Sequence, residues 1–276
     1  MGIQQVEFAH NGLTLRGEQR GEGPVVLLLH GGGQTRHAWR NTLSTVAEAG
    51  FRAIAMDARG HGQSDWAAGP DYLLTDFVSD LLAIGGQLAQ PVIVVGASLG
   101  GLTGLLALEE GLDGSALVLV DVVPNLEPEG VARIVGFMRA FPDGFESVEA
   151  CADAVAEYLP HRPRPPDSRG LEKNLRRSAD GRWHWHWDPR FVEQINTPDS
   201  GFGRAEAAAR ALLVPTLLVR GAKSDIVSEE GAARFRRLVP HADDVDVSGA
   251  RHMLAGDEND AFTDAVVAFL AGVVRA

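Results

Sequence analysis

Short apolar runs recur along this 276-residue chain, and stretches with a helical spacing of apolar residues separate them. The runs that suit strands lie at 25–30, 51–57, 91–96, 115–121, 215–221 and 242–248. The stretches that suit helices lie at 37–49, 73–89, 98–110, 229–238 and 258–272. This alternation predicts a doubly wound α/β fold, in which helices cover both faces of a mostly parallel sheet. The opening forty residues predict an antiparallel start, with a hairpin turn at 10–12.

The alternation stops after Asp121, and no run that suits a buried strand occurs between 124 and 206. In this interval apolar residues fall on helical faces, and a proline-rich stretch follows at 161–170. We therefore predict an inserted helical cap at 124–206, placed over a core domain that is built from 1–123 and 207–276.

Charge and composition exclude several classes of protein. The net charge of −12 would repel a phosphate backbone, so we expect no nucleic-acid partner. No apolar run approaches the ~18–20 residues of a membrane span, and the start of the sequence lacks the pattern of a secretory signal. The one cysteine, Cys151, cannot form an internal disulfide. We expect a soluble cytoplasmic protein without a membrane partner.

The segment VVGASLGG at 94–101 is the strongest chemical signal. A buried strand ends at Gly96 and a helical stretch begins at Leu99, with Ser98 in the turn between them. So tight a turn requires glycine two residues before and two residues after the serine, and it exposes the hydroxyl above the end of the sheet. The motif predicts that Ser98 is a nucleophile. The alternative is a serine that only caps a helix.

A serine nucleophile also needs an oxyanion site, an orienting acid and a base. VVLLLHGGGQ at 25–34 runs from a strand into consecutive glycines, so we predict oxyanion donors at the amides of Gly32 and Leu99, with Gly33 as a third. Asp225 and His252 follow two later strands. The carboxyl ends of parallel strands meet at one edge of a sheet, so both are expected near Ser98. Asp121, which ends another strand, is the alternative acid.

The chain resembles the α/β-hydrolases, in the branch of serine esterases and C–C hydrolases that carry a helical cap. The motifs that carry the resemblance are LLLHGGG, DARGHGQSD (57–65), GASLGG, GAKSDIV and ARHMLAGD. The resemblance implies Ser98 as nucleophile, His252 as general base and Asp225 as orienting acid, and it gives His61 a structural role. Epoxide hydrolases and haloalkane dehalogenases of this fold use aspartate where this chain has Ser98.

The stretch RWHWHW at 182–187 lies in the predicted cap. Alternation in an extended segment would place Trp183, Trp185 and Trp187 on one side and the two histidines on the other. The histidines suggest a metal site, but few other ligands lie near them in the sequence and a serine hydrolase needs no metal. We predict that the tryptophans pack the cap on the core and line a substrate pocket.

Together these patterns predict a serine hydrolase that cleaves an ester, a lactone or a similar acyl bond in a small, largely apolar substrate, without a cofactor or a metal. Two alternatives stay open. The same residues would serve a C–C hydrolase or a perhydrolase, and a hydrolase-like protein would bind a ligand without turnover. The seven Arg and Lys residues of 161–182 either pair with the acidic body or attract an anion.

Overall fold

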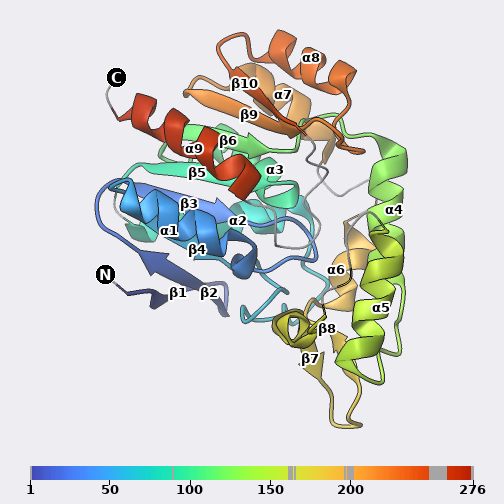
Figure 1. The fold of residues 1–276 in the computed structure, drawn as a ribbon. Helices are drawn as coiled ribbons and strands as arrows, with labels where there is room; N and C mark the ends of the chain where they lie inside the picture. Colours follow the sequence, from blue (N-terminus) through green and yellow to red (C-terminus); the bar gives the residue numbers. More distant parts are fainter. Residues whose placement is uncertain are drawn as a thin grey trace.

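A central sheet organises the molecule (Figure 1). The structure is a computed structural model that describes residues 2–88, 90–160, 164, 166–195, 197, 202–248 and 260–274. In this part of the chain the sheet has eight strands, in the order β1 (Gln4–His10), β2 (Leu13–Arg20), β4 (Arg52–Met56), β3 (Val25–Leu29), β5 (Val92–Ala97), β6 (Gly114–Val120), β9 (Thr216–Gly221) and β10 (Asp243–Val247). Strand β2 pairs antiparallel with β1 and β4, and all pairs from β4 to β10 are parallel. The predicted mostly parallel sheet with an antiparallel start is confirmed.

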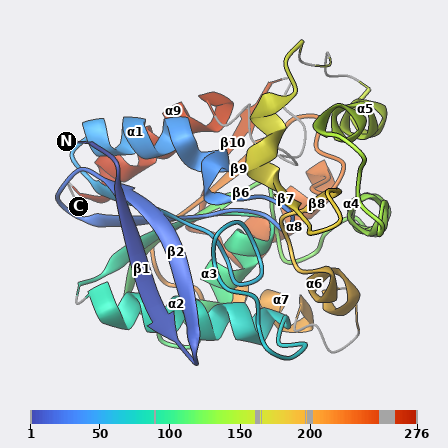
Figure 2. The same ribbon diagram turned by 90° about the horizontal axis from the view of Figure 1, so that it is seen from below.

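Helices cover both faces of the sheet (Figure 2). One face carries α1 (Arg40–Glu48), which follows the short helix η1 (Arg36–Trp39), and α9 (Asp260–Val273). The other carries α2 (Leu74–Leu88), α3 (Leu99–Glu109), α7 (Ala205–Ala211) and α8 (Glu229–Leu238). Because helices pack on both faces, the strands are apolar at consecutive positions. In β3, Val25 and Leu27 join the core under α2 and α3, whereas Val26 and Leu28 join the core under α1 and α9.

The predicted cap, residues 124–206, runs from the end of β6 to the start of α7, and most of it lies on the right and lower right of Figure 1. Its elements are α4 (Pro128–Arg139), α5 (Val148–Tyr158), η2 (Arg169–Asn174), β7 (Leu175–Arg177), β8 (Trp183–Trp185), α6 (Pro189–Gln194) and η3 (Phe202–Arg204). Strands β7 and β8 form a separate antiparallel hairpin. Phe145, Val148, Cys151 and Leu175 form a small apolar core of their own within this segment.

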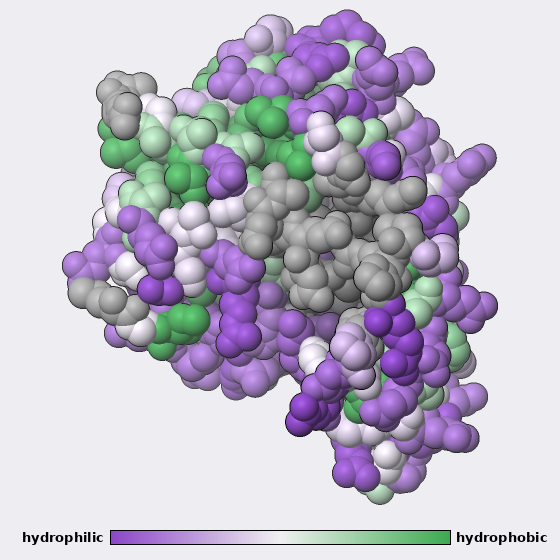
Figure 3. Space-filling model, viewed as in Figure 1, coloured by the Kyte–Doolittle hydropathy of each residue, from purple (hydrophilic) through white to green (hydrophobic). Residues whose placement is uncertain are grey.

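The surface is polar over α8, while apolar side chains gather along α9 (Figure 3). Strand β10 lies at the edge of the sheet, and its first four residues are exposed. Among the described residues, no helix is both long enough and apolar enough to cross a membrane.

Candidate active site

Ser98 lies in a sharp turn between β5 and α3. Its backbone has φ 48° and ψ −117°, a conformation that L-residues seldom adopt. The turn leaves no space for side chains at its flanking glycines. A Cβ atom at Gly96 would overlap the backbone of Gly100, and a Cβ atom at Gly100 would overlap the carbonyl of Leu29 in β3. The two glycines therefore let β5, α3 and β3 meet, and the half-buried Ser98 is held at the end of the sheet.

The glycine loop after β3 passes directly beside Ser98. A Cβ atom at Gly31 would lie 3.2 Å from the Cβ atom of Ser98. Among the described residues, the N–H groups of Gly32 and Leu99 have no hydrogen-bond acceptor, and both residues line a cavity with Ser98. The N–H group of Gly33 instead donates to Nε2 of His61, at 3.1 Å. In the described part of the chain, Gly32 of the loop and Leu99 of α3 thus offer two free amides next to the serine, whereas the amide of Gly33 is already bonded to His61.

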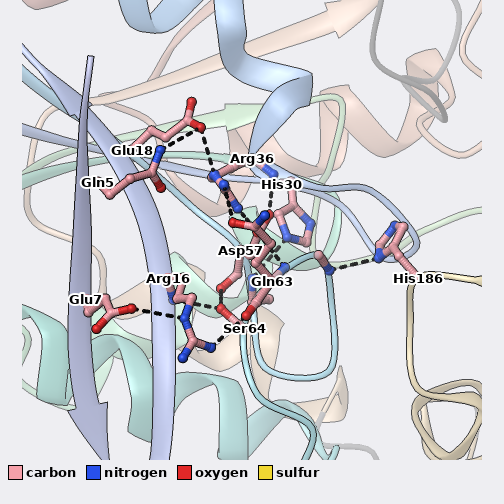
Figure 4. Close-up of polar contacts among 12 residues, drawn as sticks. Gln5, Glu7, Arg16, Glu18, His30, Arg36, Asp57, Gln63, Ser64 and His186 are labelled. Carbon is pink, nitrogen blue, oxygen red and sulfur yellow. Dashed lines mark hydrogen bonds and ion pairs between the residues drawn. The ribbon is translucent and has the colours of Figure 1, made fainter. Parts of the chain in front are cut away.

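A buried ion pair holds the 57–65 turn against η1, the short helix that follows this loop (Figure 4). The carboxylate of Asp57 accepts the backbone N–H of Arg36 at 2.7 Å and also binds the Arg36 guanidinium. It accepts the backbone N–H of Gln63 as well, at 2.9 Å. Both side chains of the pair are almost fully buried, so each satisfies the charge of the other. The first residue of the DARGHGQSD motif is therefore structural.

Two buried histidines link this turn to the glycine loop. Nε2 of His30 accepts the N–H of Ala58 at 3.0 Å, and its Nδ1 lies 2.8 Å from the carbonyl of Gly31. Nε2 of His61 accepts from Gly33, and its Nδ1 lies 2.9 Å from the carbonyl of Arg59. Burial lowers the pKa of His30, and burial followed by the nearby His30 ring lowers the pKa of His61 to about 3. Both rings are therefore neutral, and each must donate from Nδ1. His61 has the structural role that the resemblance implies.

The two candidate acids occupy one region but have different surroundings. Asp121, at φ 49° after β6, is fully buried. Its Oδ1 accepts the N–H of Gly221 at 3.0 Å, and its Oδ2 accepts the hydroxyl of Ser224 at 2.8 Å. Asp225 lies in the turn after β9 and forms an ion pair with Arg133 of α4. Asp121 therefore shapes the turn that carries Asp225. His252, the predicted base, lies outside the described residues.

Two adjoining cavities lie between the predicted cap and the edge of the sheet that carries Ser98. The first has a volume of about 70 Å³ and contains Ser98, and its walls are apolar. They are formed by Gly31, Gly32, Leu99, Leu102, Leu126, Val131, Ile134, Val135, Met138, Phe191, Ile195, Phe202 and Ile226. The second, of about 290 Å³, adds polar and aromatic groups such as His37, Tyr158, Lys173 and Trp185. Gly32, Ile134 and Met138 line both cavities, so the two meet there.

The tryptophans of the 182–187 stretch do not share one environment. Trp185 and Trp187 line the larger cavity, and their rings stack at 4.8 Å with an interplanar angle of 11°. Trp183 lines neither cavity, and the guanidinium of Arg177 lies over its ring. The extended strand covers only Trp183–Trp185. The two histidines also separate, because His186 is buried between the 57–65 turn and the glycine loop, whereas His184 packs at Gly144.

Arginines of the predicted cap are engaged within the protein itself. Arg176 donates to the carbonyl of Gly62 and lies over the ring of Trp66. Arg182 donates to the carbonyls of Asp143 and Gly144. These partners of the two residues are backbone carbonyls and an aromatic ring, so these contacts are not the predicted pairing with acidic groups of the body. Lys173 differs, because it lines the larger cavity.

The fold and the site define a class of protein, and the family model for the alpha/beta hydrolase fold matches residues 24–258. The chain therefore belongs to the α/β-hydrolase fold family. It is 33% identical to the esterase Rv0045c of Mycobacterium tuberculosis, over 96% of this chain and 88% of that protein. It is 27% identical to the 3-hydroxybutyrate-oligomer hydrolase of Cupriavidus necator, over 83% of this chain and 82% of the other.

Two solved structures of hydrolases superimpose on this fold. The crystal structure of E-2-(acetamidomethylene)succinate hydrolase superimposes with a TM-score of 0.85 at 25% identity, covering 98% of this chain and all of that one. A structure of the mycobacterial esterase superimposes with a TM-score of 0.76 at 27% identity, covering 99% of this chain and 92% of that one.

Proposed function

We propose that the protein is a serine hydrolase that cleaves a carboxylic ester, lactone or similar acyl bond in a small molecule. The observation that carries this proposal is the strained Ser98 turn beside two free amides. A serine that only capped α3 would donate or accept at the first turn of the helix, but the Ser98 side chain makes no such bond. Such strain is typical of functional sites. The esterase and the oligomer hydrolase among the relatives support acyl chemistry.

In the proposed mechanism, the hydroxyl of Ser98 attacks the substrate carbonyl and His252 accepts its proton. The N–H groups of Gly32 and Leu99 bind the oxyanion that forms, and each such donor is typically worth ~10²–10³ in rate. His252 then donates the proton to the leaving oxygen, and the acyl group remains on Ser98. Water, deprotonated by the same histidine, hydrolyses this ester. Asp225 orients the imidazole and stabilises its charged form.

The two cavities suit a substrate with two unequal parts. The smaller cavity has apolar walls around Ser98, so we assign to it one short apolar group of the substrate. The larger cavity has room for a longer arm beside the stacked rings of Trp185 and Trp187. In this proposal residues 124–206 act as a lid, because they supply most of the walls of both cavities.

The test combines covalent labelling with turnover. A fluorophosphonate should modify wild-type protein at Ser98, as peptide mass spectrometry would show, and it should not modify Ser98→Ala. A series of p-nitrophenyl esters should be hydrolysed by the wild type and not by Ser98→Ala, with the same unfolding midpoint for both proteins. Full activity in Ser98→Ala would refute the proposal. Labelling without ester turnover would direct the search to C–C or peracid chemistry.

A further inference from the structure

Buried histidines hold three successive peptide groups of the glycine loop, and one of these histidines comes from the predicted cap. His30 contacts the carbonyl of Gly31, and His61 accepts the N–H of Gly33. The carbonyl of Gly33 lies 3.2 Å from Nε2 of His186. The ring centroids of His30 and His61 are 5.2 Å apart, and those of His61 and His186 are 5.8 Å apart. The three rings thus form a continuous row behind the loop.

The hydrogen bonds of His186 fix its tautomer. Its Nδ1 accepts the backbone N–H of Gly62 at 2.8 Å, so the ring hydrogen is on Nε2 and is donated to Gly33. Burial, followed by the neighbouring His61, lowers the pKa of His186 well below its ordinary value, so the ring stays neutral. His186 is 1% exposed. It therefore bridges the 57–65 turn and the glycine loop with one bond to each.

Gly33 needs this support because its own conformation is unusual. Its φ of 75° lies in the left-handed region, which glycine adopts without strain but also leaves easily. His61 holds its N–H group and His186 holds its carbonyl, so both peptide planes of Gly33 are fixed. The peptide group between Gly32 and Gly33 comes directly after the N–H group of Gly32, which we assign to the oxyanion.

Other residues already attach this part of the predicted cap to the body. Tyr72 donates to Asp188 at 2.6 Å, and Asp188 donates through its backbone N–H to the carbonyl of Gly60 at 2.8 Å. Arg190 donates to the carbonyls of Ala67, Ala68 and Gly69. The His186–Gly33 bond is therefore not the main attachment of the cap. Its distinct contribution is the orientation of the loop.

We propose that His186 is a positioning residue for the oxyanion loop, so that the proposed catalysis depends on a hydrogen bond from the cap. This inference rests on the proposed function. Each oxyanion donor is worth ~10²–10³ in rate only when it is aimed at the developing charge. Loss of the bond to Gly33 lets the loop relax and so lowers kcat, while the walls of the two cavities and hence KM stay the same.

Two substitutions separate the two bonds of His186. An asparagine amide takes the place of Nδ1, so His186→Asn keeps an acceptor for Gly62 and loses Gly33. A glutamine amide reaches the place of Nε2, so His186→Gln keeps a donor for Gly33 and loses Gly62. We expect His186→Asn to lower kcat about tenfold or more with an unchanged KM, and His186→Gln to retain most of the wild-type kcat. His184→Asn, in the same stretch but away from the loop, is the matched control and should be unchanged.

A second readout reports on the oxyanion itself. 1,1,1-Trifluoro-2-octanone forms a tetrahedral adduct with a serine nucleophile, so its Ki should rise in His186→Asn by the factor by which kcat/KM falls. Three outcomes would overturn the inference. They are a wild-type kcat in His186→Asn, equal losses of kcat in both His186 variants, and an effect on KM alone. If His186→Asn does not fold, the test relies on His186→Gln. A tenfold loss of kcat in a folded His186→Gln would overturn the inference, and a wild-type kcat in that variant would support it. Failure of the proposed function is separate, because it appears as missing labelling and turnover in the wild type.

Discussion

The backbone of Ser98 gives a stability test that is independent of activity. At φ 48° and ψ −117° a Cβ atom is strained, and glycine is not. We therefore expect the free energy of unfolding, measured by urea denaturation, to be about 1 kcal/mol higher for Ser98→Gly than for Ser98→Ala. The same pair of substitutions at Ser44, within α1, should show the reverse order because glycine weakens a helix interior. A more stable Ser98→Ala would mean that the turn is not strained.

Substitutions of the two candidate acids should change different properties, kcat for Asp225 and the unfolding midpoint for Asp121. If Asp225 orients His252, Asp225→Asn should lower kcat by about 10⁴ with little change in the unfolding midpoint. Asp121→Asn places an N–H₂ group against the N–H of Gly221 or the hydroxyl of Ser224, so it should mainly lower the midpoint. Ester hydrolysis and thermal unfolding of both variants check this. The reverse ranking of kcat would identify Asp121 as the acid.

At the scale of elements, the two tryptophans at the opposite ends of β8 have different surroundings. Trp185 lines the larger cavity and Trp183 does not. Burial of a large apolar side chain is worth roughly 1.5–3 kcal/mol, so Trp185→Ala should lower kcat/KM for octanoate esters about tenfold or more. The loss should be smaller for butyrate and minimal for acetate, because short chains do not reach the ring. Trp183→Ala is the control and should lose no chain-length preference. A uniform loss for all esters in Trp185→Ala would show that the ring only packs the structure.

Much of the element order follows from the sequence because it rests on local patterns. Consecutive apolar residues such as those of β3 are buried between two helical layers, and that pattern is visible without coordinates. The Ser98 turn is equally local, since Gly96 and Gly100 are required by contacts within one strand–turn–helix unit.

Contacts between distant segments could not be predicted in the same way. His186 meets Gly33 across 153 residues, and its alternation with His184 suggested a shared environment that the two rings do not have. One signal in the sequence could have indicated this contact. His186 lies two residues before Asp188 and three before Pro189, where α6 begins and where the backbone of Asp188 is hydrogen-bonded to Gly60 of the body. The meeting of the two cavities at Met138 depends on how α4 docks, which no local pattern encodes.

At the scale of the whole molecule, the row of neutral histidines should make the fold sensitive to acid. Burial lowers the pKa of His30, His61 and His186, whereas the histidines of an unfolded chain titrate near 6.5. Below about pH 6.5 the unfolded state therefore binds more protons. As the pH falls below 6.5, the free energy of unfolding should fall by up to roughly 1.4 kcal/mol per pH unit for each histidine that stays neutral in the fold, and these groups should have no effect above pH 7.

Urea unfolding at pH 7, 6 and 5 would measure this slope. His186→Asn removes one of the three groups, so its slope should be shallower by about one proton. His184→Asn should have the wild-type slope. A free energy of unfolding that is the same at pH 7 and pH 5 would contradict the assignment of neutral buried rings.

The order of strands in the sheet also sets the order in which the site is completed during synthesis. Strands β1 to β6 are contiguous in the sheet, so they can pair before residues beyond 120 have left the ribosome. The predicted cap comes next, and the body residues that it docks on, such as Gly33, Gly60 and Gly62, are already present. Strands β9 and β10 then join one edge, and the turn after β9 carries Asp225, the proposed acid. The proposed base, His252, comes later still in the sequence. Under the proposed function, a nascent chain therefore carries its proposed nucleophile and oxyanion loop long before its proposed acid and base, so it would stay chemically inert until synthesis is nearly finished.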